Sequence, residues 1–142
     1  MKIRIAVILC SGLFMWSFAQ TGVGAQASAD SVLGGVYTEA QAMRGASVYA
    51  DNCAMCHGAD LSGSDPIPPL LGAAFAGNWK TVGDLFDKTL TSMPAFAPGS
   101  LTPEQTADVL AYVFSANKCP AGEAELAADA APLQKIMVEP AP

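Results

Sequence analysis

The most reactive side chains of the chain lie within five consecutive residues, Cys53-Ala54-Met55-Cys56-His57. Two thiols stand about one helical turn apart, and an imidazole follows the second thiol directly. Thiols at this spacing can add to the two vinyl groups of one haem, and the imidazole can then bind the haem iron as its proximal axial ligand. His57 is the only histidine in the sequence. The pattern therefore predicts covalent haem c held by Cys53 and Cys56, with His57 on the iron.

Two other kinds of site use the same residue types. A dithiol redox pair is expected within a βαβ pattern, which the sequence does not indicate. A zinc site could combine these residues with Cys119, but adjacent ligands fit one tetrahedron poorly and a second C-x-x-C is missing. A chance match to a short pattern also stays open on spacing alone, and the rest of the chain argues against it.

Residues 1–27 predict a secretory signal and hence a periplasmic location. Lys2 and Arg4 form a short basic region, residues 5–19 are apolar, and Ala25-Gln26-Ala27 matches an A-x-A cleavage site. Cleavage after Ala19 or Ala25 is an open alternative. Export is compatible with haem attachment, which takes place outside the cytoplasm.

The remaining cysteines do not form a disulfide framework. Cys10 lies inside the apolar run and would leave with the signal, although lipid modification at Cys10 is an alternative. After cleavage Cys119 stands alone beside the two haem cysteines. An odd cysteine in an exported protein can pair between chains. We expect Cys119 instead to be a small buried apolar side chain.

The chain is acidic. Its formal charge is −6, and removing the two basic residues of the signal leaves −6 − 2 = −8, from five basic and thirteen acidic residues. Such a chain is not expected to bind nucleic acid or anionic lipid through bulk charge. The N-terminal apolar run is also too short for a comfortable membrane span, so stable membrane insertion is not expected.

Three helices are predicted, with a Gly-rich, flexible lead-in before them at residues 28–37. Thr38 and Gln41 form a capping box for a helix that runs to about Asp51. Gly45 lies on its apolar stripe, which suggests that a second helix crosses closely there. The alternative is that the helix merely tolerates this glycine, and the place of Gly45 on the stripe fits that interpretation nearly as well.

The other two helices follow Pro- and Gly-rich loops. The loop after His57 contains prolines that exclude helix, and its length suggests that it walls one edge of a flat cofactor. Thr81 begins a helix that ends at Met93-Pro94. Thr102 begins the last helix, which has proline at its first position, Gln105 as capping-box partner, and about Asn117 as its end. No strand is convincing, and the last four residues, including Glu139, are expected to be frayed.

The iron opposite His57 needs a sixth ligand or an open site. Methionine sulfur is the usual ligand in electron carriers that lack a second histidine. Met55 lies between the haem cysteines, Met43 lies before them, and Met137 lies in a tail expected to be mobile. Met93 comes far enough along the chain to pass round the haem edge. We therefore predict Met93 as the second axial ligand.

In order and spacing, these residues resemble the class I c-type cytochrome family over roughly residues 38–118. The shared features are Gly45-x-x-x-Tyr49, Cys53-x-x-Cys56-His57-Gly58, Pro68-x-Leu70-x-Gly72, a tryptophan, Met93-Pro94 and Leu110-x-Tyr112. The resemblance implies that the Pro68 carbonyl accepts a hydrogen bond from His57, and that Trp79 lies near a haem propionate. Residues 117–126 are similar to the C-terminal extension of cytochromes that serve quinoprotein alcohol dehydrogenases.

We therefore expect an all-α, cytochrome c-like fold with three main helices around one covalent haem. Its parts would be a signal peptide (1–27), the lead-in (28–37), a cytochrome c domain (38–118) and a C-terminal extension (119–142). The expected function is periplasmic transfer of single electrons, without enzymatic activity, by a monomer. The donor would be a dehydrogenase, for example a quinoprotein alcohol dehydrogenase, and the acceptor a terminal oxidase or membrane cytochrome. The alternatives are a small haem peroxidase or a haem-based ligand sensor.

Overall fold

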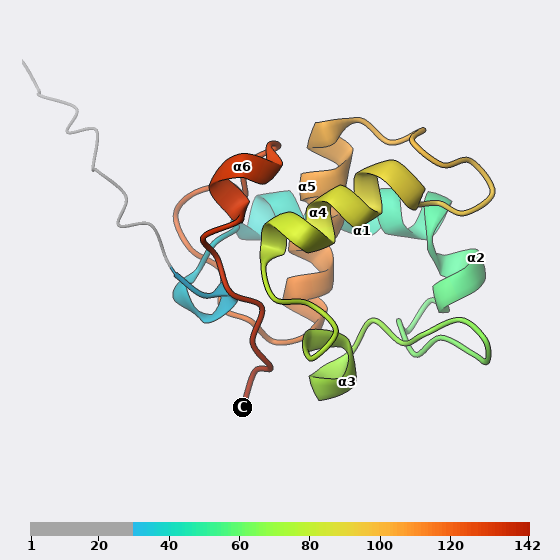
Figure 1. The fold of residues 1–142 in the computed structure, drawn as a ribbon, viewed down its shortest axis with the longest axis horizontal. Helices are drawn as coiled ribbons and strands as arrows, with labels where there is room; N and C mark the ends of the chain where they lie inside the picture. Colours follow the sequence, from blue (N-terminus) through green and yellow to red (C-terminus); the bar gives the residue numbers. More distant parts are fainter. Residues whose placement is uncertain (1–29) are drawn as a thin grey trace, which may run out of the picture.

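The structure, a computed structural model, describes residues 30–142, and the predicted signal sequence lies outside this range. Within it the fold is helical, with isolated β-bridges but no strands, which confirms the expected all-α class (Figure 1). None of the helices in this part of the chain has the length and apolarity that a membrane span requires. In chain order the helices are η1 (Val32–Gly34), α1 (Glu39–Asn52), α2 (Ala54–His57), α3 (Gly72–Ala76), α4 (Val82–Ser92), α5 (Pro103–Ala116) and α6 (Ala130–Leu133).

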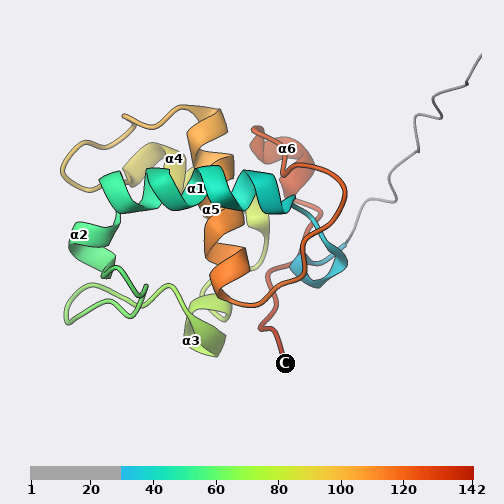
Figure 2. The same cartoon turned by 180° about the vertical axis from the view of Figure 1, so that it is seen from behind.

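Helices α1 and α5 cross at Gly45, as the sequence predicted (Figures 1 and 2). A Cβ atom added to Gly45 would lie 1.8 Å from the carbonyl oxygen of Asp108 and 3.0 Å from Cβ of Tyr112. The two helix backbones therefore touch, and only glycine fits at this point. Tyr49, one turn further along α1, stacks on Tyr112 with ring centroids 5.2 Å apart.

Helices α4 and α5 begin at the predicted caps. The Thr81 hydroxyl accepts a hydrogen bond from Asp84 N, and the Thr102 hydroxyl accepts one from Gln105 N. At Thr102 the capping box is complete, because Gln105 Oε1 accepts in return from the Thr102 amide. These local bonds fix where α4 and α5 start.

The predicted capping box at the start of α1 is incomplete. Thr38 caps the helix through the Gln41 amide, but the Gln41 side chain turns to the C-terminal extension instead. Gln41 Nε2 donates to Leu126 O at 3.0 Å, and Gln41 Oε1 accepts from Leu126 N at 2.7 Å. Gln41 is 2% exposed. A buried amide gains more from these two partners than from the exposed cap.

The expected flexible lead-in is wrong for residues 30–37. Val32, Val36 and Tyr37 are all buried in the core. The Tyr37 hydroxyl donates a hydrogen bond of 2.7 Å to the carbonyl of Cys119, the first residue of the C-terminal extension. Glycine content suggested mobility, but three apolar side chains tie this segment to the helices.

The C-terminal extension, residues 119–142, is also more ordered than expected. Leu126, Leu133 and Val138 are buried, and the backbone of Met137 donates to Asp30 O at 2.8 Å and accepts from Val32 N at 3.0 Å. Even Glu139 has a partner, since its carboxylate accepts a hydrogen bond from the Ser31 hydroxyl. The predictions of a mobile Met137 and frayed last residues are therefore wrong up to Glu139.

The long loop between α2 and α3 lacks helix, as predicted, and is held by hydrogen bonds to the end of α5. Asn117, the C-cap of α5, donates from Nδ2 to Leu70 O at 2.8 Å and accepts from Gly72 N at 2.7 Å. The short helix α3 follows and was not predicted. Its five residues are too few for a hydrophobic period to be visible in the sequence.

Candidate haem site

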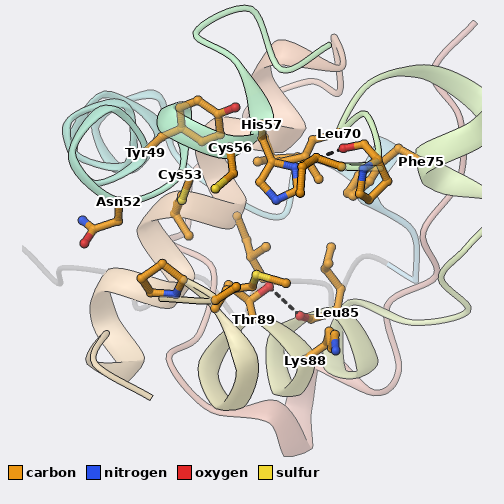
Figure 3. A pocket seen from close by; sticks show the side chains of 18 of the residues that line it. Tyr49, Asn52, Cys53, Cys56, His57, Leu70, Phe75, Leu85, Lys88 and Thr89 are labelled. Carbon is orange, nitrogen blue, oxygen red and sulfur yellow. Dashed lines mark hydrogen bonds between the residues drawn. The ribbon is translucent and has the colours of Figure 1, made fainter. Parts of the chain in front are cut away.

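An apolar pocket lies between the loop that follows α2 on one side and helices α4 and α5 on the other. The residues predicted to bind the haem or its iron all line this pocket, so the fold brings together side chains from positions 53 to 93 (Figure 3). The full lining is Tyr49, Asn52, Cys53, Cys56, His57, Ile67, Pro68, Leu70, Phe75, Trp79, Leu85, Lys88, Thr89, Met93, Pro94, Ala95, Val109, Leu110 and Val113.

Cys53, Cys56 and His57 lie on one side of the pocket because the chain turns at the end of α1. Cys53 joins α1 to α2, and its amide still donates to Tyr49 O at 2.8 Å. The next turn, α2, places Cys56 and His57 beside it, with His57 N donating to Cys53 O at 2.9 Å. Figure 3 shows the two thiols and the imidazole facing the same cavity.

The imidazole of His57 is oriented by the loop. Its Nδ1 atom lies 3.0 Å from the carbonyl oxygen of Pro68. A bond to a carbonyl requires a proton on Nδ1, so the free lone pair is on Nε2, the nitrogen available to a metal. Gly63 allows the loop to pass this closely, because a Cβ there would lie 2.6 Å from Ile67 O and 2.7 Å from Pro68 O. The structure thus brings together the two groups that the resemblance paired.

Helix α4 forms the opposite side of the pocket. Leu85, Thr89 and Met93 follow one another at four-residue spacing, so they lie on one face of this helix and its C-cap. The Thr89 hydroxyl donates to Leu85 O at 2.8 Å and therefore presents no free donor to the cavity. Figure 3 shows Leu85, Thr89 and Lys88 across the cavity from Cys53, Cys56 and His57.

Of the four methionines in residues 30–142, Met93 lines the pocket and the others do not. Met43 is 70% exposed and Met55 is 78% exposed, and Met137 lies in the C-terminal extension. Met93 is partly buried, its amide donates to Thr89 O at 3.0 Å, and the following Pro94 is buried. Its place on the wall opposite His57 is compatible with the predicted axial role.

Aromatic side chains complete the pocket. Trp79 lines it and is partly buried, as the resemblance led us to expect, whereas its contact with a propionate stays a prediction. Phe75, from α3, also lines it and is 4% exposed, but the sequence analysis missed it. A lone phenylalanine among alanines carries no periodic signal. The Tyr49 hydroxyl donates to Gly58 O at 2.6 Å, and burial, more than the nearby Cys53, raises the pKa of Tyr49 to about 12.

Among the described residues that line the pocket there is no carboxylate, and Lys88 is the one lysine or arginine. Arg44, the only arginine after the predicted signal, forms ion pairs of 2.9 Å with Asp108 and Glu125 and does not line the pocket.

Burial, followed by the neighbouring Cys56, raises the pKa of Cys53 to about 11. Without haem, this thiol is therefore protonated at neutral pH.

The donor set fits a covalently held haem. Two thiols and an oriented imidazole share one wall, Met93 also lines the pocket at the end of α4, and most of the remaining lining is apolar. The zinc alternative needed Cys119 close to the motif, but Cys119 is buried in the core beside Tyr37. Its burial confirms the predicted environment of this thiol. Among residues 30–142, no cluster of three or more His, Cys, Asp or Glu is arranged to hold a metal ion.

The fold of residues 30–142 is helical and has no strands, and its C-x-x-C-H run faces an apolar pocket. These features together are those of a c-type cytochrome domain. A sequence model described as cytochrome C oxidase, cbb3-type, subunit III, matches residues 40–113, and the chain belongs to this family. Membership implies covalent haem c. The resemblance to c-type cytochromes is thus confirmed, whereas the finer likeness to cytochromes of quinoprotein alcohol dehydrogenases is not shown.

A curated relative is the cbb3-type cytochrome c oxidase subunit CcoP of Rubrivivax gelatinosus. It is 37% identical over 86 residues, which are 56% of this chain and 27% of the relative. The chain therefore spans about a quarter of the length of that relative. No solved structure matches the chain.

Proposed function

We propose that this chain is a periplasmic electron carrier that binds one haem c through Cys53 and Cys56. The observation that carries the proposal is that His57 and Met93 line the same apolar pocket. Leu85 and Thr89, on the helix that ends at Met93, lie across the cavity from His57. When bound, the haem supplies a one-electron Fe(III)/Fe(II) couple. With His57 and Met93 both bound to it, the iron would have no site for oxygen or peroxide, so the chain would move electrons and would not be an enzyme.

Each of these pocket residues would have a separate role in binding the haem. The thiols of Cys53 and Cys56 anchor the haem, and the Pro68 carbonyl holds His57 in the orientation that presents Nε2. Met93 would exclude small ligands, and Trp79 would lie at a propionate. The apolar walls keep water away and, together with a thioether ligand, favour the reduced state, which raises the potential.

The partners follow from the family and from the chemistry of a small carrier. The relative is named as a subunit of a cbb3-type oxidase, so we propose that electrons leave this chain toward a terminal oxidase or another membrane cytochrome. The donor would be a periplasmic dehydrogenase, of which the quinoprotein alcohol dehydrogenases are one class. The carrier would act as a monomer, and its acidic surface favours a partner with a basic face.

Intact-mass measurement of the exported protein tests the proposal. Wild type should carry the mass of one haem that acid-acetone does not extract. The double variant Cys53→Ser, Cys56→Ser should lose this mass, and Cys119→Ser should keep it, because Cys119 does not line the pocket. Haem retention that depends on Cys119, or a mass of two haems, would contradict the assignment.

A further inference from the structure

The C-terminal extension contacts the start of α4, the helix that ends at Met93. Val82 N donates to Ile136 O at 2.9 Å, and Val138 N donates to Lys80 O at 3.2 Å. Figure 1 shows α6 lying against the first turn of α4. The first N–H groups of a helix have no partner within the helix, so an outside carbonyl at Val82 satisfies one of them.

Gln134 strengthens this contact at the cap itself. The Thr81 hydroxyl, which caps α4 by accepting from Asp84 N, donates to Gln134 Oε1 at 2.8 Å. Gly83 lies directly beneath, and a Cβ added there would lie 2.6 Å from the Gln134 side chain and 2.9 Å from Ala130 O. The extension is therefore packed on α4 as closely as two helices pack at a glycine.

The same extension also holds α1, the helix that ends at the haem cysteines. The buried Gln41 amide bonds both the N–H and the C=O of Leu126. On the surface, Arg44 links Asp108 of α5 to Glu125 of the extension. One segment thus connects α1, which leads into the haem cysteines, to α4, which forms the other side of the pocket.

Helix α4 can transmit this restraint along its length. It has eleven residues, hence about 16 Å at the rise of an α-helix, and it is stiff over that distance. Leu85 and Thr89 face the pocket from its middle, and Met93 follows at its end. A small rotation at Thr81 would therefore move Met93 relative to His57.

We propose that the C-terminal extension is a brace that positions Met93, with Gln134 as its main side-chain contact on α4. The inference rests on the proposed function, because Met93 must be the sixth ligand for the brace to affect it. Gln134 does not line the pocket, so it is a positioning residue. Loosening the brace populates states in which the Met93 sulfur is off the iron and an added ligand can enter.

Imidazole titration of the ferric protein measures this population. The apparent affinity for a competing ligand rises in proportion to the fraction of molecules whose sixth position is open. Gln134 is itself exposed, but its bond to Thr81 is partly buried, so Gln134→Ala should lower the imidazole midpoint about three- to tenfold, as expected from one lost hydrogen bond. The matched control is Lys135→Ala, at a neighbour that is equally exposed but is not the partner of Thr81, and it should shift the midpoint less than about twofold.

Two further variants and a second readout keep the test decisive if one protein folds poorly. Gly83→Ala would stabilise an isolated helix by propensity, but here it should act like Gln134→Ala, because the added Cβ displaces α6. Removal of residues 129–142 should have the largest effect. Hydrogen exchange of the α4 amides in the reduced protein should accelerate in all three variants, without any imidazole present.

The outcomes separate the inference from the proposed function. If Met93→Ala binds imidazole with the wild-type midpoint, Met93 is not the displaced ligand, and both fail. If Met93→Ala binds more tightly but Gln134→Ala and Gly83→Ala keep the wild-type midpoint and α4 exchange, the brace alone is overturned. Faster α4 exchange with a lower midpoint in both variants, and neither change in Lys135→Ala, supports the brace.

Discussion

Replacing Gly45 with alanine tests how the crossing of α1 and α5 sets the site. The new Cβ would lie 1.8 Å from the Asp108 carbonyl oxygen, and Cβ atoms do not approach closer than 3.0 Å, so the helices must separate by 3.0 − 1.8 = 1.2 Å. The obstacle is backbone, which cannot rotate away as a flexible side chain would. Because α1 ends at Cys53, the displacement would also carry the haem cysteines away from α5.

The expected change in the free energy of unfolding is the sum of two opposing effects. Overpacking costs typically 1–3 kcal/mol, and a clash with backbone belongs at about the upper end. Alanine gains about 1 kcal/mol over glycine in a helix. The free energy of unfolding should therefore fall by about 2 kcal/mol, which corresponds to a Tm lower by about 8 °C for a domain of this size.

Thermal unfolding of the haem-containing proteins, followed by circular dichroism, measures the effect. Ser47→Ala is the control, because Ser47 is exposed on the same helix and the change tests propensity without the crossing. Its Tm should equal or slightly exceed that of wild type. A Gly45→Ala protein as stable as Ser47→Ala would refute the close contact of the two backbones.

Three other predictions concern the core, the extension and the partner. Burial raises the pKa of the Cys119 thiol and shields it, so folded haem-bound protein should react with iodoacetamide far more slowly at Cys119 than urea-unfolded protein does; equal rates would contradict its burial. Gln41→Ala leaves the backbone N–H and C=O of Leu126 without their side-chain partner, so the free energy of unfolding, measured by urea denaturation, should fall by about 1–3 kcal/mol. The control is Gln105→Ala, at an exposed capping glutamine, where the free energy of unfolding should fall by about 1 kcal/mol or less. Equal losses in the two variants would argue against the buried hydrogen bonds of Gln41. Reduction by the native donor, in stopped flow, should slow as salt rises from about 10 to 150 mM, since the screening length falls from roughly 30 to 8 Å; a flat or rising rate would exclude charge steering.

The parts of the site that depend on local spacing could be predicted from the sequence. The C-x-x-C-H run fixes the relative places of Cys53, Cys56 and His57, because one turn of helix determines them. The threonine caps of α4 and α5 were predictable for the same reason, since a cap and its partner lie three residues apart. The place of Gly45 on an apolar stripe suggested the helix crossing, but on that fact alone a tolerated glycine was nearly as good an interpretation.

What depends on contacts between distant segments could not be predicted in this way. Val32, Leu133 and Val138 stand among glycine, alanine and proline without helical or alternating period, so their burial depends on tertiary packing alone. The same holds for Gln41, whose buried partner lies 85 positions away. Phe75 reaches the pocket from a helix too short to show a pattern.

Carbon monoxide binding to the ferrous protein tests the central claim most directly. With His57 and Met93 both on the iron, wild-type protein should show no carbon monoxide complex by absorption spectroscopy, whereas Met93→Ala should form one and have a lower reduction potential. Met43→Ala, at an exposed methionine outside the pocket, should behave as wild type. Ready binding by wild type would instead support an open-site peroxidase or a ligand sensor. An unchanged spectrum and potential in Met93→Ala would show that another group is the sixth ligand.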